Sequence, residues 1–286
     1  MKSIDTLIED IYKTLEEGIN TSSVQNRDAI HTCSTEIARA LTRQLGEGKR
    51  SKQSTLRMSQ IGKPDRQLWY DLKSTAEPEP INGQTKMKFI MGDILEAVLI
   101  LLTEVSGHKV TEQQKEVEVD GVKGHKDCRI DGTLVDIKTA SSYAFKKFKE
   151  ETLHSDDPFG YIAQLSGYAE AGNDQEAAFF AIDKSSSEMA LMKIEPIHMI
   201  NAKQRIGKVK TFLSSDSPPD RCYPDEEDGK SGNRKLAIGC VYCPYKDDCW
   251  KNANGGQGLR KFKYSNGIRY LTQVGKLPDV QEVTNG

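Results

Sequence analysis

Residues 124–139, GHKDCRIDGTLVDIKT, decide the fold of this chain. The Asp-Gly dipeptide at 131–132 predicts a two-residue type I′ turn, and the strands on either side of it then pair directly. In this register the facing pairs are Asp127 with Asp136 and His125 with Lys138. Side chains alternate along a strand, so these four share one face of the hairpin. The opposite face is apolar and suited to burial, and it carries Cys128, Ile130, Val135 and Ile137.

Two carboxylates that face each other across a strand pair repel each other and destabilise the pair. A divalent cation between Asp127 and Asp136 would offset this repulsion. Oxygen ligands favour Mg²⁺ or Mn²⁺. Lys138 reaches the same place and could orient or activate the attacking water, or neutralise charge on a phosphate. The alternative is a solvated hairpin with surface Asp–Lys pairs, which the apolar opposite face disfavours. Asp131 is explained by the turn, because Asp tolerates positive φ.

Hydrophobic periodicity and turn residues predict a mixed α/β domain. The expected helices are 4–17, 34–46 (N-cap Ser34 or Thr35, stop at Gly46), one within 59–73 that begins after Pro64, a largely buried 86–105, 158–171 (N-cap Asp157, Pro158 in the first turn) and a basic amphipathic 197–213. The expected strands are 116–119, 122–130, 133–139, 177–183 and 188–194. Residues 46–54 form a basic, flexible link. We expect three parts: a helical segment over 1–55, a core over 56–215 and a Cys-rich part over 216–286.

Composition limits the class of protein. The 286 residues include 40 Lys plus Arg and 42 Asp plus Glu, a net charge of −2. This balance excludes a surface that is basic throughout, but not a local basic groove for nucleic acid. No apolar run is long enough to span a membrane, and the first residues lack the apolar run of a secretory signal. We therefore expect a cytoplasmic protein without membrane contact.

Four of the six cysteines lie close together near the C-terminus. Their spacing is C-x17-C-x2-C-x5-C, formed by Cys222, Cys240, Cys243 and Cys249. The C-x2-C pair places two thiolates within reach of one metal, and the other two could complete a four-thiolate site for Zn²⁺ or an iron–sulfur cluster. Four unligated cysteines are the alternative. Cys128 faces the predicted core.

These motifs resemble the PD-(D/E)XK nuclease superfamily, and in particular its RecB-like branch, which includes phage exonucleases. GHKD, then VDIK, then YIAQLSGY occur in the family's order. The resemblance covers residues 56–250 and implies a restriction-endonuclease-like mixed sheet flanked by helices. It implies metal binding by Asp127, Asp136 and the Ile137 carbonyl, with Lys138 as the catalytic lysine. Gln164 and Tyr168 match the family's Gln-x-x-x-Tyr motif, which contacts DNA or orients the active site.

The resemblance also implies a metal ligand on an upstream helix, and MGDILEA places Glu96 there. A Glu within so apolar a helix costs free energy unless it is paired or ligating. The alternative is that Glu96 is exposed on the side of the helix that faces solvent. His125 could touch a phosphate or support the site. The C-x2-C-x5-C trio looks like the iron–sulfur trio of these nucleases, whose first cysteine usually lies N-terminal to the core. Here the fourth ligand would be Cys222, or Cys33 by a longer reach.

The expected function is therefore Mg²⁺-dependent hydrolysis of DNA, with an exonuclease of phage-type recombination or replication favoured. A structure-specific endonuclease and a non-catalytic nucleic-acid-binding module are the alternatives. The expected partners are DNA and a single-strand-binding or recombination protein. Candidate DNA contacts are Arg66 and the basic, aromatic stretch over 143–149. Cleavage polarity, strand preference and oligomeric state do not follow from the sequence.

Overall fold

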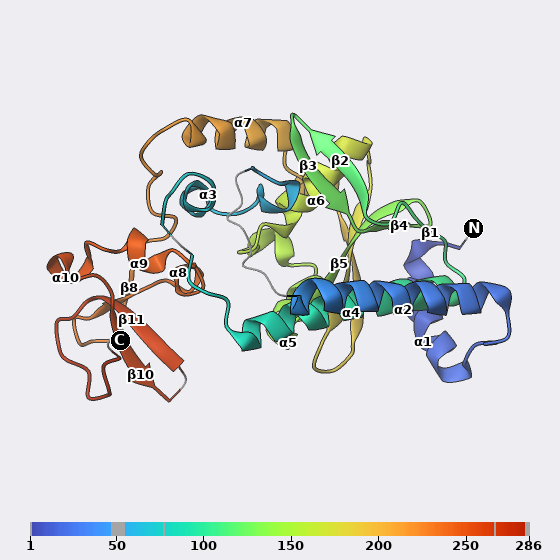
Figure 1. Cartoon of the computed structure of the whole chain (residues 1–286), viewed down its shortest axis with the longest axis horizontal. Coiled ribbons are helices and arrows are strands. Elements are labelled where there is room, and N and C mark those ends of the chain that lie inside the picture. The colour runs from blue at the N-terminus through green and yellow to red at the C-terminus, as the bar shows by residue number, and fades with distance from the viewer. Residues whose placement is uncertain (1, 47–54, 77, 266, 284–286) are drawn as a thin grey trace. The chain divides into compact units, whose positions relative to one another are not determined.

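The computed structural model describes residues 2–46, 55–76, 78–265 and 267–283 (Figure 1). They form two compact units. The sheet unit consists of the described residues of 1–51, 56–62 and 81–207, and the cysteine unit of those of 52–55, 63–80 and 208–286. This division differs from the expected separate segment over 1–55. Within the sheet unit, α1 (Leu7–Glu17) packs on β7 (Met189–Ile194), and α2 (Val24–Leu45) packs on α4 (Gly83–Val105). The predicted basic link lies, apart from Gly46, outside the described residues.

The sheet unit is built on a five-stranded mixed sheet of order β1-β4-β5-β6-β7. Only β5 and β6 run parallel, and the other neighbours are antiparallel. The predicted mixed α/β architecture is therefore confirmed. The strands are β1 Val110–Thr111, β4 Cys128–Ile130, β5 Thr133–Ala140, β6 Ala177–Asp183 and β7 Met189–Ile194.

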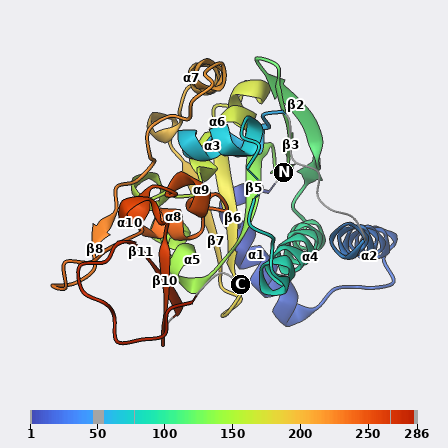
Figure 2. The same ribbon diagram turned by 60° about the vertical axis from the view of Figure 1, so that its left-hand side comes forward.

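Helices cover both faces of this sheet (Figure 2). One face packs on η1, α1 and α4 through side chains such as Leu7 and Leu99, and receives the predicted apolar face of the hairpin, Cys128 included. The other packs on α5, α6 and α7 through side chains such as Phe148 and Leu165. The helices are η1 Ile4–Thr6, α1 Leu7–Glu17, α2 Val24–Leu45, η2 Met58–Gln60, α4 Gly83–Val105, α5 Ser142–Lys149, η3 Leu153–Ser155, α6 Tyr161–Gly172, η4 Pro196–His198 and α7 Ala202–Leu213.

The predicted turn register is confirmed on β4 and β5, where Cys128 pairs with Val135 and Ile130 with Thr133. The expected pairing of His125 with Lys138 is wrong. The predicted strand is interrupted at Asp127. The part before it, β3 (Val122–Lys126), pairs with β2 (Lys115–Val119) in a separate two-stranded sheet. His125 therefore pairs with Glu116 of β2 and is exposed.

Several predicted helix bounds are corrected. The second helix begins at Val24, so Ser34 and Thr35 lie inside it, where their hydroxyls bond to carbonyls one turn back. The helix expected from 158 begins at Tyr161, although Asp157 still accepts hydrogen bonds from its first N–H groups. The helix expected from 197 begins at Ala202. The helix α4 is well buried only in its second half, since side chains near its start, including Met87, are exposed.

The cysteine unit has short elements around a small core. Its strands form a sheet of order β10-β11-β9-β8, and Leu236, Cys240, Trp250 and Ala253 make the core. The elements are α3 Asp65–Leu72, β8 Glu226–Glu227, β9 Arg234–Lys235, α8 Ile238–Val241, α9 Lys246–Cys249, α10 Ala253–Gly256, β10 Arg260–Tyr264 and β11 Gly267–Gln273. Throughout the described ranges, every helix is too short or too polar to cross a membrane.

Candidate active site and cysteine pocket

Asp136 lies at the centre of the sheet unit, on the middle strand β5, and its side chain is fully buried. Its Oδ1 accepts a hydrogen bond from Gln164 Nε2 at 3.1 Å. Its Oδ2 lies 2.5 Å from Lys138 Nζ, but it accepts no hydrogen bond of acceptable geometry. A buried carboxylate oxygen with only this ionic contact keeps coordination capacity for another cation.

Asp127 occupies the break between β3 and β4, directly across from β5. Its Oδ2 accepts a hydrogen bond from the Ile137 N–H at 2.7 Å, which fixes the carboxylate beside the strand that carries Asp136. Burial, and then the charges of Asp136 and Glu96, raise the pKa of Asp127 well above its ordinary value. The expectation that Asp127 and Asp136 lie together is thus met by a strand break, and not by a continuous ladder.

Glu96 is half-buried on α4, and burial followed by the charge of Asp136 raises the pKa of its carboxyl to about 7. Burial likewise raises the pKa of Asp136. Three separate segments supply Glu96, Asp127 and Asp136. The charge of Asp136 nevertheless raises the pKa of both other carboxyls. The sheet unit therefore brings three carboxylates near one another in a place shielded from solvent, where they repel each other.

Lys138 is the cation of this group. Burial alone would lower the pKa of its ammonium, but Asp136 and Asp127 reverse that effect and the pKa is raised. The ammonium also lies 4.7 Å from the centre of the Tyr161 ring. Lys138 is therefore held in its charged form, which favours stabilising phosphate charge over acting as a base.

Gln164 and Tyr168 lie one turn apart on α6 and face Asp136. The Tyr168 hydroxyl is 3.4 Å from Gln164 Nε2, and only 2% of Tyr168 is exposed. The Tyr168 ring packs so closely on Gly124 that a Cβ there would lie 2.8 Å from it. Of the two roles expected for Tyr168, orienting the site fits this burial better than contact with DNA.

Two residues that support this site were not predicted from the sequence. Gln114 donates to Glu96 Oε1 through its side chain and to the Asp127 carbonyl through its backbone N–H, each at 2.9 Å. Glu112 binds Lys126 and Arg129, which flank Asp127. Both Glu112 and Gln114 have left-handed φ, near 50°, which non-glycine residues seldom adopt and which functional sites often contain. No sequence pattern signals this conformation, so nothing pointed to these residues.

The three carboxylates suit a divalent cation by their chemistry, since they are hard oxygen donors and Asp136 Oδ2 has no hydrogen bond. Over the described part of the chain, however, no three His, Cys, Asp or Glu side chains are gathered closely enough to hold a metal ion. Negatively charged carboxylates repel each other, so we expect these three to lie farther apart without a bound cation than with one.

The expected DNA contacts outside this cluster lie elsewhere. His125 is 3.9 Å from Glu116 on the exposed face of the β2–β3 pair. Arg66 belongs to the cysteine unit and donates to Cys249 Sγ. In the stretch over 143–149, Phe145 and Phe148 are buried in the core and cannot stack on bases. Its lysines pair with carboxylates, as Lys149 does with Glu188.

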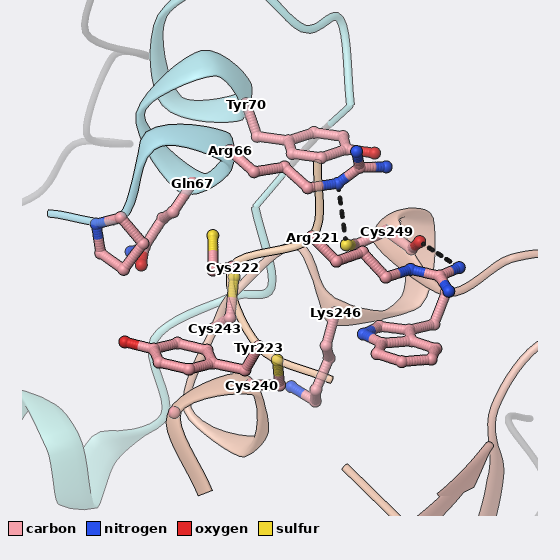
Figure 3. A pocket seen from close by; sticks show the side chains of 13 residues that line it. Arg66, Gln67, Tyr70, Arg221, Cys222, Tyr223, Cys240, Cys243, Lys246 and Cys249 are labelled. Atoms are coloured by element: carbon pink, nitrogen blue, oxygen red, sulfur yellow. Dashed lines mark hydrogen bonds between the residues drawn. The ribbon is translucent and has the colours of Figure 1, made fainter. Parts of the chain in front are cut away.

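The four clustered cysteines line one small pocket of about 30 Å³ in the cysteine unit (Figure 3). Burial, with contributions from neighbouring thiols, raises the pKa of both Cys240 and Cys243 to about 11. The fourth member is Cys222, while Cys33 is buried on α2 in the sheet unit. Thiolates are soft ligands, so four cysteines on one pocket suit Zn²⁺ or iron by their chemistry. As with the carboxylates, no three of these side chains lie close enough together in the described residues to hold a metal ion.

No protein-family model and no curated protein matches the chain. Several solved structures resemble it at low identity. The protein SSO0001 is 16% identical, with 74% of this chain and 93% of that chain covered and a TM-score of 0.40. A phage-related exonuclease from Haemophilus somnus 129PT is 15% identical (56% and 90% covered, TM-score 0.35). LHK-Exo, an alkaline exonuclease from Laribacter hongkongensis solved in complex with dAMP, is 18% identical (55% and 87% covered, TM-score 0.32).

Proposed function

We propose that this chain is a divalent-metal-dependent nuclease that hydrolyses phosphodiester bonds in DNA. The observation that carries the proposal is the environment of Asp136. A fully buried carboxylate has one oxygen without a hydrogen bond and a charged lysine beside it, and its charge raises the pKa values of two further carboxylates, Glu96 and Asp127. A structural role alone would leave this concentration of buried like charge uncompensated.

Glu96, Asp127 and Asp136 would hold Mg²⁺ or Mn²⁺, with the Ile137 carbonyl as a further ligand. When bound, the ion supplies Lewis acidity toward the scissile phosphate and lowers the pKa of a water. Lys138 stabilises the negative charge that develops on the phosphate. Gln164 orients Asp136, and Tyr168 positions Gln164 through its hydroxyl.

The order of the sequence motifs supports DNA as substrate and an exonuclease of phage-type recombination or replication as the mode of action. A single-strand-binding or recombination protein would be the natural partner of such an enzyme. An endonuclease would use the same residues, so the substrate must separate the two. A covalently closed circle has no end and is cut only by an endonuclease.

The test is incubation with end-labelled single- and double-stranded DNA and with closed circles, in Mg²⁺ and in EDTA. We expect Mg²⁺-dependent release of label from linear DNA, abolished by Asp136→Asn. Asp28→Asn, at an exposed position on α2, is the matched control. Cleavage that survives Asp136→Asn, or Mg²⁺-indifferent DNA binding without cleavage, contradicts the proposal.

We propose further that the four cysteines of the pocket bind one metal centre. The spacing and the shared pocket support four-thiolate binding of either Zn²⁺ or a [4Fe-4S] cluster. Colour separates the two. A brown protein that bleaches on reduction indicates iron–sulfur, and a colourless protein with stoichiometric zinc indicates Zn²⁺. Purified protein with neither metal refutes the proposal.

A further inference from the structure

A second, larger cavity of about 470 Å³ lies in the cysteine unit, next to the cysteine pocket. Its size is in the range of pockets that hold small organic ligands. Its lining includes the cations Arg66, Arg221 and Lys251, and the aromatic rings of Trp69 and Tyr70. The proposed active site uses none of the lining residues, although Arg66 is one of the DNA contacts expected from the sequence and Cys249 also lines the cysteine pocket.

Hydrogen bonds to backbone carbonyls, to Asn252 and to the Cys249 sulfur hold the two guanidinium groups in fixed positions. Arg66 donates to the Pro219 carbonyl and, at 3.1 Å, to Cys249 Sγ. Arg221 lies 3.8 Å from the centre of the Trp250 ring and donates to the Cys249 carbonyl at 3.3 Å and to Asn252 Oδ1. Figure 3 shows both side chains converging on Cys249. None of these partners is a carboxylate, and those of Arg221 are a carbonyl, an amide and an aromatic ring, so its positive charge is oriented without being cancelled.

The charge of the cavity is therefore positive. Within the described part of the chain, Arg66, Arg221 and Lys251 have no carboxylate at ion-pair distance, and Lys251 is exposed. Asp248 is the carboxylate among the lining residues, against three cations. Oriented, uncompensated guanidinium groups are typical of phosphate recognition.

The aromatic side of the cavity is oriented as well. Trp69 is half-buried, and its indole N–H donates to the Ser215 carbonyl at 3.1 Å, which fixes the ring. Tyr70 is buried, meets the Trp69 ring edge-on at a centroid distance of 5.5 Å, and stacks on Tyr245 at 5.3 Å. A partly exposed indole beside fixed cations is an arrangement on which a base can stack while its phosphate meets the positive charge.

We propose that this cavity binds a phosphate-bearing nucleotide, either free or as one nucleotide of a single strand. The phosphate lies against Arg221 and Lys251, and the base stacks on Trp69. A base within a duplex cannot take this position, because both of its faces are already stacked. The inference goes beyond the proposed nuclease activity, since the cavity uses none of the residues assigned to cleavage.

The test uses the full chain with its metal centre and with Asp136→Asn, so that no ligand is cleaved. Oligothymidylate, dTMP and inorganic phosphate are each titrated while tryptophan fluorescence is followed. The chain has two tryptophans, Trp69 and Trp250, so a quenched signal can be assigned by Trp69→Phe. We expect nucleotide to quench, Trp69→Ala to weaken binding about tenfold, and Lys251→Glu to weaken it and lower the salt slope by about one.

Lys230→Glu is the matched control, because Lys230 is exposed in the same unit and does not line the cavity. Metal content of each variant shows that the cysteine pocket is intact. Equal affinity for dTMP and oligothymidylate supports a free-nucleotide site, and binding of the oligonucleotide alone supports a strand site. Competition by phosphate as strong as by nucleotide, without quenching, overturns the proposal, as does unchanged affinity in Trp69→Ala and Lys251→Glu. Cleavage by the unmodified chain is scored separately, so failure of one proposal does not decide the other.

Discussion

The two candidate sites of this molecule are held in place by different means. The carboxylates sit on a five-stranded sheet with an apolar core on each face, and Asp136 is on its middle strand. The cysteine pocket sits on helices of only four residues, α8 and α9, with four residues in the neighbouring core. Apolar burial therefore supports the first site, whereas little supports the second without a bound metal.

This contrast predicts that the two sites respond differently to loss of metal. Free carboxylates remain positioned by the sheet, because strand pairing and packing do not need the ion. Free thiols lose the cross-links that would order their segment. The largest expected effect is accordingly on the cysteine unit.

Cys240→Ser, or removal of the metal by a chelator, should unfold much of the cysteine unit and leave the sheet unit folded. Structural metal centres contribute on the order of 10 kcal/mol to folding. Hydrogen exchange should show loss of protection over 220–253 and unchanged protection in β5 and β6. Cys33→Ala is the control, since Cys33 lies outside the pocket. Retained protection over 220–253 in metal-free protein would contradict the contrast.

Lys138→Met should have the opposite signature, with loss of chemistry and retention of architecture. Removing one donor from a developing charge costs about 10³-fold in rate, or about 4 kcal/mol. Cleavage should fall by that amount, while metal content at the cysteines stays constant. Lys149→Met, an exposed lysine paired with Glu188, should cleave normally. If Lys138→Met also released the metal of the cysteine pocket, the two sites would not be independent.

The parts that sequence predicted correctly are those set by local chemistry. The Asp-Gly turn fixed the register of β4 with β5 and so brought Asp127 near Asp136. The C-x2-C-x5-C spacing placed three thiols on one pocket. Alternation within a strand does not specify its neighbour, so the break at Asp127 and the departure of His125 to β2 were missed. The contact of Arg66 with Cys249 joins residues 183 positions apart, which no local pattern encodes.

Glu112→Gln should destabilise the sheet unit by about 2 kcal/mol at pH 7, because it removes charge-assisted hydrogen bonds and leaves the buried Lys126 ammonium without its carboxylate. Hydrogen bonds from Lys115, Lys126 and Arg129 lower the pKa of Glu112 in the folded chain. A carboxyl with a lowered folded pKa stabilises fully above its unfolded pKa, about 4.3, and loses that contribution as the pH falls toward the folded value.

Denaturant titrations of both proteins at pH 7 and at pH 3 measure this effect. The difference in the free energy of unfolding should shrink at pH 3, because this pH lies below the unfolded pKa and the lowered folded pKa of Glu112 then contributes only part of its stabilisation. Glu118→Gln, at an exposed position of β2, is the control and should show little difference at either pH. A difference that stays constant between the two pH values would show that the ion pairs of Glu112 are not its cause.

Gln114→Ala should have the smallest effect and is the most direct probe of how the sheet unit supports its carboxylates. Gln114 touches both Glu96 and the backbone of Asp127, so it aligns ligands that come from different segments. Loss of a partner that orients a metal ligand weakens metal affinity about tenfold, or about 1.4 kcal/mol. The Mg²⁺ concentration for half-maximal cleavage should rise by that factor, with little change in rate at saturating Mg²⁺. Calorimetric titration with Mn²⁺ should show the same shift without any substrate.

The neighbouring Gln113 provides a matched control for this last change. Its side chain also donates to a glutamate on α4, Glu104, at 3.4 Å, but it does not contact the proposed ligands. Gln113→Ala therefore removes a comparable hydrogen bond from the same loop. A metal requirement that rises equally in both variants would mean that the loop acts through general stability, whereas a rise confined to Gln114→Ala locates the effect in the alignment of Glu96 with Asp127. In that case the sheet alone does not align the carboxylates. The loop over 112–114, in which Glu112 and Gln114 have left-handed φ, is then also needed to hold Glu96 in line with Asp127.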